Sequence, residues 1–163
     1  MSLKIISVDY DNPRHAADLG RALDAYASDP MGINHPLDPE IRNNLARELG
    51  KVPHAFSLLC YFDEQLAGFT NCFFGFSTFK LKKLLNIHDF AVLPEFRRQG
   101  LALKLLDRIE EIARENDCCK ITLEVLQGNT VAQSVYQKFG FESYELDPAQ
   151  GQALFWEKPL SVK

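Results

Sequence analysis

Residues 97–102 read Arg-Arg-Gln-Gly-Leu-Ala and combine two cations with small residues directly before a helical pattern. The mostly apolar stretch 84–93 precedes them, and Pro94 ends it because proline cannot donate a hydrogen bond to a β-ladder. A turn that opens a helix leaves several backbone N–H groups unpaired, and the helix dipole adds positive potential there. Gly100 and Ala102 would let a bulky ligand approach the backbone closely. These residues therefore predict a site for a phosphate or pyrophosphate group.

Two familiar phosphate loops are excluded by the sequence. The pattern G-x-x-x-x-G-K-[ST] of ATP- and GTP-binding loops is absent, and so is the dinucleotide pattern G-x-G-x-x-G. Taken alone, the segment also fits an ordinary helix start after a basic turn, and both interpretations stay open at this point.

Two titratable side chains, His88 and Asp89, interrupt the apolar strand predicted over 84–93. Such side chains are rarely buried unless they are paired or functional. A purely structural interpretation has one of them facing solvent at the sheet margin and the other paired with a neighbour. Because neighbours in a strand point to opposite faces, we expect at most one of the two to face a substrate.

Glu124 and Tyr136 are the other candidates for chemistry. Glu124 lies within a predicted strand over 120–126, where an outward-facing residue is the simplest interpretation. Tyr136 lies on the apolar face of a predicted helix, and its spacing alone favours a tyrosine of the core.

The elements that must position these residues alternate between strands and helices. The strand, helix and strand within 84–126 predict a parallel pair with a right-handed crossover. Asn129 is a suitable N-cap for the helix that carries Tyr136, and Gly140 is a suitable end. In chain order, we expect strands over 3–8, 55–62, 66–76, 84–93, 120–126, 141–146 and 153–158, and helices with apolar stripes over 16–26, 41–49, 101–113 and 132–139.

Length and composition indicate a single domain over residues 1–163, with 46% hydrophobic and 25% charged residues. The sequence has no apolar run long enough to cross a membrane and no signal peptide pattern, so we expect no membrane contact. A net charge of −4 argues against nucleic acid as a partner. An acidic protein that binds an anion needs local positive charge, which Arg97, Arg98 and Lys104 supply.

The cysteines show neither a C-x-x-C motif nor the spacing of zinc ligands, and the four histidines are scattered, so we expect no metal. Cys60 and Cys72 lie in apolar runs, and the adjacent Cys118 and Cys119 are also expected to be structural thiols rather than redox-active ones. Structural thiols of this kind fit a cytoplasmic protein.

The segment 97–102 resembles the [Q/R]-x-x-G-x-[G/A] pattern of the GNAT N-acetyltransferases, with Ala102 where the family usually has glycine. The second half of that family is similar to Leu-Glu-Val at 123–125, Asn-Thr-Val-Ala at 129–132, Tyr136, and Phe-Gly-Phe at 139–141. The resemblance is specific over about 84–141 and rests on element order before that. It implies an α/β fold of mixed α+β character, with a mixed, mostly antiparallel sheet of six to seven strands. One βαβ pair would be parallel, and helices would cover both faces.

The resemblance also implies direct transfer of an acetyl group from acetyl-CoA to a primary amine of a small molecule, such as a polyamine or an amino sugar. Tyr136 would protonate the departing CoA thiolate, a reasonable role because a phenol of pKa ~10 can supply a proton to a thiolate whose acid titrates near ~8.5. Asn129 would hydrogen-bond the pantetheine region, and the backbone N–H near Val92 would stabilise the oxyanion. The other expected cofactor contacts are Phe90, Ala91 and Val92 along the pantetheine, Arg97, Arg98, Gln99, Gly100, Leu101, Ala102 and Leu103 at the pyrophosphate, and Tyr136.

For the acceptor, the segment Ile-His-Asp-Phe-Ala-Val resembles that of the diamine acetyltransferases, in which carboxylates hold the amine. Asp89 is therefore expected to contact or deprotonate the acceptor, with His88 as a second candidate. Some family members use a glutamate at the position of Glu124 as a base through water, and others have no single base. The acceptor pocket is expected from 31–36, the second helix, and the Phe-rich stretch 69–85.

Three other functions stay open from the sequence. A CoA-binding regulatory module without turnover would share the fold. An acetyltransferase could instead act on a protein N-terminus or a lysine. A nucleotide-binding protein would use the basic turn for ATP or NAD. Formation of a homodimer is left open as well.

Overall fold

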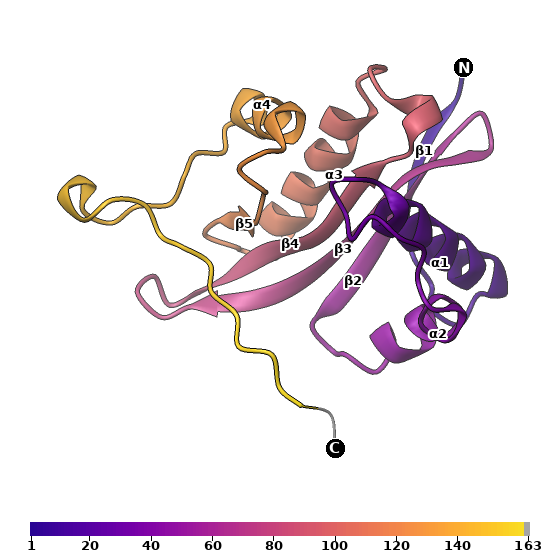
Figure 1. Ribbon diagram of the computed structural model, residues 1–163, viewed down its shortest axis with the longest axis horizontal. Helices are drawn as coiled ribbons and strands as arrows, with labels where there is room; N and C mark the ends of the chain where they lie inside the picture. Colours follow the sequence, from indigo (N-terminus) through magenta and orange to yellow (C-terminus); the bar gives the residue numbers. More distant parts are fainter. Residues whose placement is uncertain (162–163) are drawn as a thin grey trace.

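A five-stranded mixed sheet forms the centre of the protein in a computed structural model that describes residues 1–161 (Figure 1). Its strands follow one another in sequence order, and only β4 and β5 are parallel. The predicted parallel βαβ unit is therefore confirmed. The strands are β1 (Leu3–Ser7), β2 (Ala55–Phe62), β3 (Gln65–Ser77), β4 (Lys82–Val92) and β5 (Ile121–Leu123).

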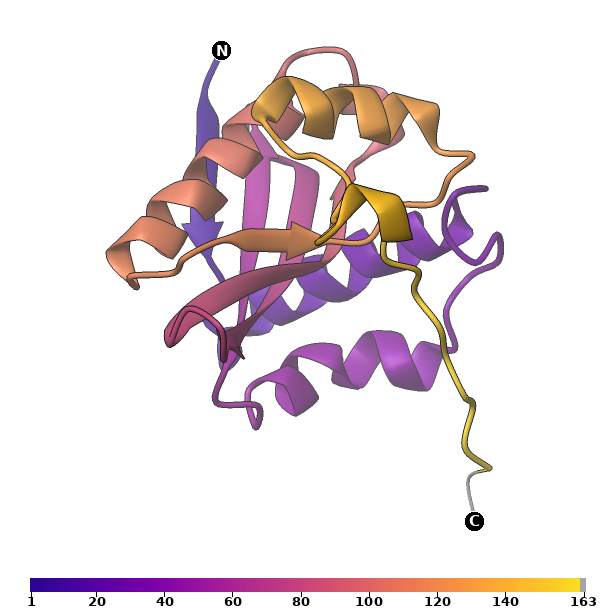
Figure 2. The ribbon, with the colours of Figure 1, turned by 90° about the vertical axis from the view of Figure 1, so that its left-hand side faces the viewer.

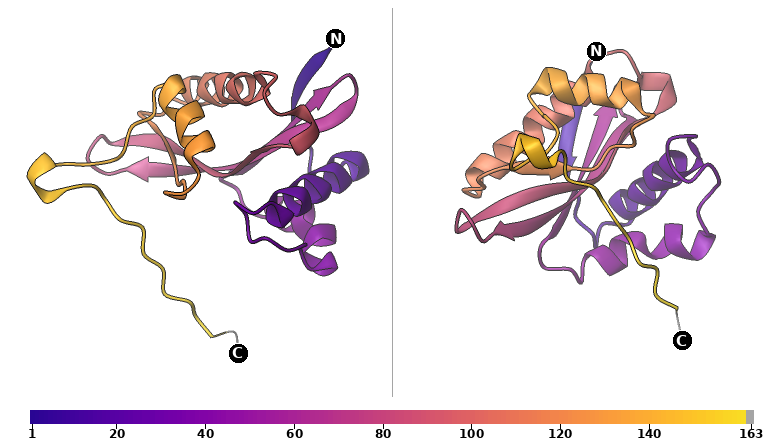
Figure 3. Two further views of the ribbon diagram at one scale, coloured as in Figure 1. Left: turned by 45° about the horizontal axis from the view of Figure 1, so that its top comes forward. Right: turned by 60° about the vertical axis from the view of Figure 1, so that its left-hand side comes forward.

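Helices cover both faces of this sheet, as expected (Figure 3). One face carries α1 (Pro13–Ser28) and α2 (Pro39–Leu49), and the other carries α3 (Leu101–Glu115) and α4 (Thr130–Phe139). Short 3₁₀ turns occur at Pro94–Phe96 (η1) and Pro148–Gln150 (η2).

Polar side chains cap the starts of the two helices on the first face. The Asn12 side chain accepts hydrogen bonds from two backbone N–H groups of α1, and Asp38 does the same for one N–H of α2, directly before Pro39. The β2–β3 hairpin turns at Asp63 and Glu64, which both have positive φ, as tight two-residue hairpin loops require.

Two hydrophobic cores lie against opposite faces of the sheet because strand residues alternate between them. On β2, Leu58 belongs to the core under α3, and Leu59 belongs to the core under α1 and α2. The first core is built on Leu85, Leu105, Leu106 and Ile109, and the second on Leu19, Ala22, Ala46 and Phe69.

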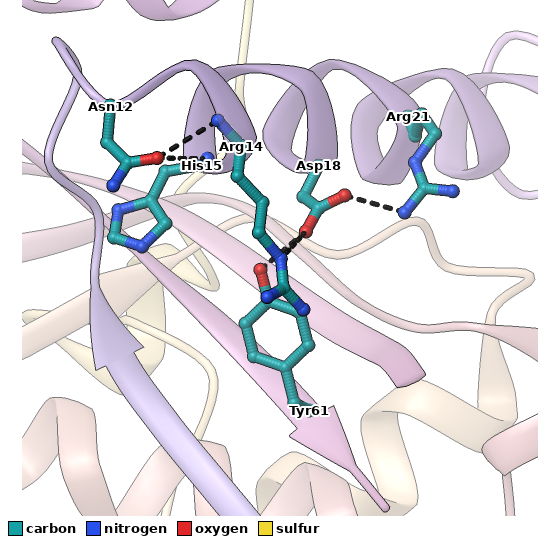
Figure 4. A network of polar contacts seen from close by, with 6 residues as sticks. All are labelled: Asn12, Arg14, His15, Asp18, Arg21 and Tyr61. Atoms are coloured by element: carbon teal, nitrogen blue, oxygen red, sulfur yellow. Dashed lines mark hydrogen bonds and ion pairs between the residues drawn. The ribbon is translucent and has the colours of Figure 1, made fainter. Parts of the chain in front are cut away.

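A buried carboxylate joins α1 to β2 (Figure 4). Asp18 is only 6% exposed, and its two oxygens accept hydrogen bonds from the Tyr61 hydroxyl and the Arg21 guanidinium, each at 2.6 Å. The Arg14 guanidinium lies over the Tyr61 ring. Burial, helped by Asp18, raises the pKa of Tyr61. Because the buried charge is paired and hydrogen-bonded on both sides, it fixes where α1 lies on the sheet.

The sheet has fewer strands than the six to seven expected, because the predicted strands over 141–146 and 153–158 do not form. That part of the chain is an extended arm that leaves the body after α4 (Figure 2). A backbone bond of 2.9 Å from Ala153 N–H to the Tyr144 carbonyl connects its two halves. A strand needs a neighbour for its backbone groups, and β5, which ends at Leu123 and not at Leu126, offers only three residues.

Candidate active site

An opening lies where β4 and β5 separate. Their parallel ladder runs only from Leu85 paired with Ile121 to Ile87 paired with Leu123. β4 continues to Val92, whereas the chain after Leu123 turns away toward α4. Over residues 1–161, no strand pairs with this edge of β4 beyond Ile87. The backbone of Phe90, Ala91 and Val92 therefore borders the opening.

A β-bulge in β4 aims both titratable residues at the same face. Asn71 of β3 pairs with Asp89 and Cys72 pairs with Ile87, so His88 is the extra residue. The His88 ring lies 5.4 Å from the ring of Phe73, on the same face as Asn71 and Asp89. The premise that these two neighbours point to opposite faces is therefore wrong, because the bulge breaks the strict alternation.

A row of hydrogen bonds crosses three strands and ends at Asp89. Asn71 Nδ2 donates to Asp89 Oδ2 at 2.9 Å, and Ser57 Oγ donates to Asn71 Oδ1 at 2.6 Å. The Tyr10 hydroxyl closes the far end, 2.8 Å from Ser57 Oγ. Ser57 and Asn71 are 1% and 2% exposed, so the row is a buried support that fixes one carboxylate oxygen of Asp89.

Tyr136 enters the opening from α4. Its ring contacts those of Phe90 and Phe141 edge-on, with centroids at 6.0 and 5.8 Å. Burial raises the pKa of Tyr136 to about 12, so the phenol stays protonated at neutral pH. Tyr26 of α1 contributes to that rise, and the pKa of Tyr26 is itself raised by burial and by Asp89. Tyr26 of α1 is thus close enough to Asp89 of β4 and to Tyr136 of α4 for charges on these residues to interact.

The basic turn before α3 is built as an open cradle. Gly100 and Arg98 have φ of +78° and +62°, and no side chain caps the helix. The first backbone bond of α3 runs from the Lys104 N–H to the Gly100 carbonyl at 3.3 Å. A Cβ at Gly100 would meet no atom within 4 Å. Leu101, only 4% exposed, anchors the helix start, so the N–H groups after Gly100 point into free space.

Arg97 is engaged within the protein. Its Nη2 donates to Asp29 Oδ2 at 2.6 Å and its Nε to the Val92 carbonyl at 3.0 Å. The Arg97 guanidinium holds the pKa of the Asp29 carboxyl below its ordinary value. Arg97 thus ties the end of α1 to the end of β4, whereas Arg98 and Gln99 are exposed at the turn.

The other residues that the sequence predicted for the site lie at the ends of helices and strands. Asn129 is the N-cap of α4, and its Oδ1 accepts a bond of 3.2 Å from the Ala132 N–H. Glu124 is exposed and lies just beyond the end of β5, outside the strand predicted for it. Ala102 and Leu103 are half-buried in the first turn of α3.

The Phe-rich stretch divides into core and surface. Phe69 is fully buried, whereas Phe76 and Phe79 are 58% and 86% exposed at the end of the β3–β4 hairpin. Between them, Phe73 lies against the rings of His54 and His88. Phe69 therefore belongs to the core, Phe73 lies beside His88, and Phe76 and Phe79 are exposed toward the end of the hairpin.

Ser57, Asn71 and Tyr26 are the site residues that sequence reasoning missed. The signal for two of them was present, because Ser57 and Asn71 are polar residues within apolar strands, as Asp89 is. Tyr26 gave no signal beyond its place in the apolar stripe of α1.

Other features bear on the chemistry that the site can support. Over residues 1–161, no group of three His, Cys, Asp or Glu side chains could hold a metal ion. Within the same range, no helix has the length and apolar character needed to cross a membrane. All four cysteines are free, and burial raises the pKa of Cys60 to about 11 and of Cys72 to about 12.

Comparison with known proteins points to one family. A model of the acetyltransferase (GNAT) family matches residues 21–141. Thialysine N-epsilon-acetyltransferase of Bos taurus is 30% identical over 90 residues, which are 55% of this chain and 51% of that protein. The chain thus spans about half the length of this curated relative.

Solved structures share the fold. The crystal structure of a probable acetyltransferase superimposes with a TM-score of 0.79 at 24% identity, over 98% of this chain and 99% of that one. A structure of aminoglycoside N-acetyltransferase AAC(6')-Iy in complex with CoA gives a TM-score of 0.73 at 20% identity, over 96% and 95% of the two chains.

Proposed function

This chain belongs to the GNAT acetyltransferase family, and we propose that it transfers an acetyl group from acetyl-CoA directly to a primary amine of a small molecule. The observation that supports this most is the open turn at Gly100, which follows the unpaired end of β4. That strand also carries Asp89, and the ring of its Phe90 contacts the ring of Tyr136. The names of the similar proteins support an amine acceptor: thialysine for one and an aminoglycoside for the other.

Acetyl-CoA is the acyl donor in this proposal. The free N–H groups after Gly100 and the exposed Arg98 bind its pyrophosphate, with Gln99, Leu101, Ala102 and Leu103 completing the turn. The backbone edge at Phe90, Ala91 and Val92 pairs with the pantetheine arm, and the Asn129 amide bonds it. Arg97 acts indirectly by holding the turn against Asp29. Binding the donor beside the acceptor lowers the barrier mainly through proximity.

Asp89 prepares the acceptor. An amine is protonated in water and must lose that proton before it can attack the thioester carbonyl. Asp89, held by Asn71 through one oxygen, attracts the cationic amine and accepts the proton directly or through water. His88 lies on the same face and borders the acceptor, and the exposed Glu124 is a more distant base that needs a water chain. A backbone N–H near Val92 stabilises the oxyanion.

Tyr136 completes the transfer by protonating the departing sulfur. A pKa of about 12 keeps the phenol neutral, as a proton donor must be. The same burial makes it a weaker acid, so the proton moves readily only when the CoA thiolate is equally desolvated, which raises the pKa of its thiol too. The direct mechanism needs no acyl-cysteine, and the buried Cys60 and Cys72 are protonated at neutral pH.

A thiol-release assay separates this proposal from its alternatives. Wild-type protein is mixed with acetyl-CoA and, in turn, polyamines, amino sugars, lysine analogues and peptides with free N-termini. Release of CoA that depends on a small amine, with the acetylated amine found by mass spectrometry, is the expected result. Tight CoA binding by calorimetry without turnover on any acceptor would indicate a regulatory module. Faster turnover on peptides would indicate a protein acceptor, and ATP or NAD competing with CoA would indicate nucleotide binding.

The proposal covers residues 1–163 as one acetyltransferase domain, because the helices of both faces share one sheet. The four free cysteines favour a reducing compartment such as the cytoplasm.

A further inference from the structure

The loop between α1 and α2, residues 29–37, is held to α1 at both of its ends. At its start, the Gly32 N–H donates to the Asp29 carbonyl at 2.8 Å and closes a tight turn. At its end, the Leu37 N–H donates to Asp24 Oδ1 of α1 at 2.8 Å. A loop whose two ends are both hydrogen-bonded to one helix has a backbone that is fixed relative to that helix.

A single guanidinium joins this loop to the opening between β4 and β5. Arg97 Nη2 donates to Asp29 Oδ2 at 2.6 Å, and Arg97 Nε donates to the Val92 carbonyl at 3.0 Å. Asp29 is the first residue of the loop, and the backbone of Val92 borders the opening, so the two residues contact the same side chain. The Asp29 side chain is only 17% exposed, whereas that of Arg97 is 49% exposed. The ion pair therefore places the start of the loop at the rim of the opening.

The end of α1 that carries this loop also lies close to Asp89. Tyr26, in the last turn of α1, packs its ring edge-on against that of Phe69 at 6.2 Å, and both belong to the same core as Ala91 of β4. Ala91 pairs with Phe69 and lies two residues from Asp89. Burial raises the pKa of Tyr26, and the charges of Asp89 and Asp29 add to that rise. The carboxylate proposed to hold the amine and the first residue of the loop thus both lie near one tyrosine.

The middle of the loop offers an apolar surface beside this carboxylate. Met31 and Ile33 are 41% and 55% exposed between the two anchored ends. After Asp29, the loop as far as residue 37 contains no Asp, Glu, Lys or Arg. Small-molecule sites commonly combine such apolar walls with a few placed polar groups that fix orientation. The loop is therefore suited to contact the carbon skeleton of an amine whose charge is held by Asp89.

We propose that Asp29 and Arg97 are a positioning pair for the acceptor, an inference that rests on the function proposed above. The pair holds the loop 29–37 at the rim of the opening, where the exposed apolar side chains of the loop form one wall of the amine site. Neither charged residue touches the amine. Loss of the pair loosens the wall and weakens amine binding, because a preorganised wall costs less to order. The cradle for acetyl-CoA stays in place, since the buried Leu101 anchors it separately.

Kinetics of paired variants test this role. Asp29→Asn keeps the shape of the side chain, including an oxygen for the Met31 N–H, and removes the charge that pairs with Arg97. The KM of the amine with the fastest turnover should rise about three- to fivefold, because a partly exposed ion pair contributes a modest free energy. The kcat and the Kd for acetyl-CoA should stay at their wild-type values. Arg97→Gln should have the same effect, and the double variant should be no worse than either single variant. Glu111→Gln is the matched control, because it removes an ion pair of 2.8 Å in the second half of α3 and should change neither constant.

Three kinetic results would count against the pair. An active Asp29→Asn with unchanged amine KM, or additive effects of the two substitutions, would overturn the positioning role and leave the proposed function standing. A loss of acetyl-CoA affinity of tenfold or more in Arg97→Gln would overturn it too, because Arg97 would then bind the pyrophosphate. Wild-type protein without turnover on any amine would instead overturn the proposed function, and with it the role of the pair toward the acceptor.

Hydrogen exchange of the free protein gives a second readout, which needs no reaction. Peptides that cover residues 29–37 should exchange faster in Asp29→Asn and in Arg97→Gln than in wild type, because the loop opens more often without its ion pair. Glu111→Gln should match wild type. Equal exchange in all four proteins would show that the pair does not hold the loop and would overturn the proposal.

Discussion

Asn71 and Asp89 lie directly opposite each other on β3 and β4, and Asn71 Nδ2 donates to Asp89 Oδ2 at 2.9 Å. The bulge at His88 creates this relationship, because it aims Asp89 at the face where Asn71 and Ser57 are buried. The carboxylate is thus held by a fixed amide, with its Oδ1 accepting no hydrogen bond from residues 1–161. In the proposed reaction this second oxygen meets the amine.

Replacing that carboxylate should remove the preference for cationic acceptors. Asp89→Asn keeps the shape of the side chain but loses the charge and the base. We expect turnover on small primary amines to fall by ~10²-fold or more, the usual contribution of a positioned general base. Steady-state rates across the amine panel measure this, with neutral and acidic acceptors as the comparison. Equal rates in Asp89→Asn and wild type would remove Asp89 from the site.

Removing the Asn71 side chain should loosen the Asp89 carboxylate while leaving that carboxylate in place. Asn71→Ala leaves Asp89 without a side-chain partner among residues 1–161 and leaves Ser57 Oγ with the Tyr10 hydroxyl alone, so the free energy of unfolding should fall by about 1–3 kcal/mol and kcat should also decrease. Asn86→Ala is the matched control, because it deletes another cross-strand amide bond, the 3.0 Å bond from Asn86 of β4 to Thr122 of β5. If both variants lose stability and neither loses kcat, the row is structural only.

The sequence predicted most elements because their signals are local. The caps at Asn12 and Asp38 and the alternation within the β2–β3 hairpin depend on neighbours in the chain. The bulge at His88 was hidden, because an extra residue shows only when the register of two strands is known. The arm was misread for a related reason: its residues favour strands, but a strand forms only beside a neighbour, and the end of β5 at Leu123 could not be known from the residues of the arm.

In the candidate site, too, residues in local motifs could be predicted, whereas relations between residues distant in the chain could not. The turn at Gly100 and the tyrosine at Tyr136 lie in motifs that can be read from residues close in sequence. Ser57, Asn71 and Asp89 are far apart in the chain, and only the sheet register brings them into one row. Arg97 carried a clear positive charge, but its partner Asp29 lies 68 residues away, so its pairing could not be predicted.

A larger side chain at Gly100 should block the donor. Gly100→Val fills the open space where the pyrophosphate is proposed to lie and adds strain at φ +78°. Calorimetry should show at least a tenfold loss of acetyl-CoA affinity. Gly151→Val is the control, because Gly151 has φ +80° and equally open surroundings in the arm. Unchanged affinity in folded Gly100→Val would contradict the cradle.

Stability should fall in alkaline solution because of the buried thiols. Burial raises the pKa of Cys72 to about 12 and of Cys60 to about 11, from an ordinary value near 9. The folded state therefore holds these protons more tightly, and the stability this gives is complete below about pH 9 and is lost as pH rises toward 12. Urea unfolding from pH 8 to 11 measures it.

A substitution isolates the thiol at Cys72. Cys72→Ala should reduce the alkaline slope of the unfolding free energy by up to ~1.4 kcal/mol per pH unit, the limit for one group. Ile87→Val shortens a neighbouring core residue without removing a titratable group, so its slope should match that of wild type. An unchanged slope in Cys72→Ala would mean that other groups cause the alkaline loss.

Tyr136→Phe tests most directly the claim that acetyl transfer occurs in the opening between β4 and β5. The change keeps the ring packing against Phe90 and Phe141 and removes only the proposed proton donor. Because the phenol acts only as sulfur leaves, kcat and kcat/KM should fall together by ~10²- to ~10⁴-fold, with the Kd for acetyl-CoA within about twofold of wild type. Preserved kcat with a lower Tm would make Tyr136 a core residue, and preserved kcat with weaker acetyl-CoA binding would make it a cofactor contact. Either outcome would contradict the account.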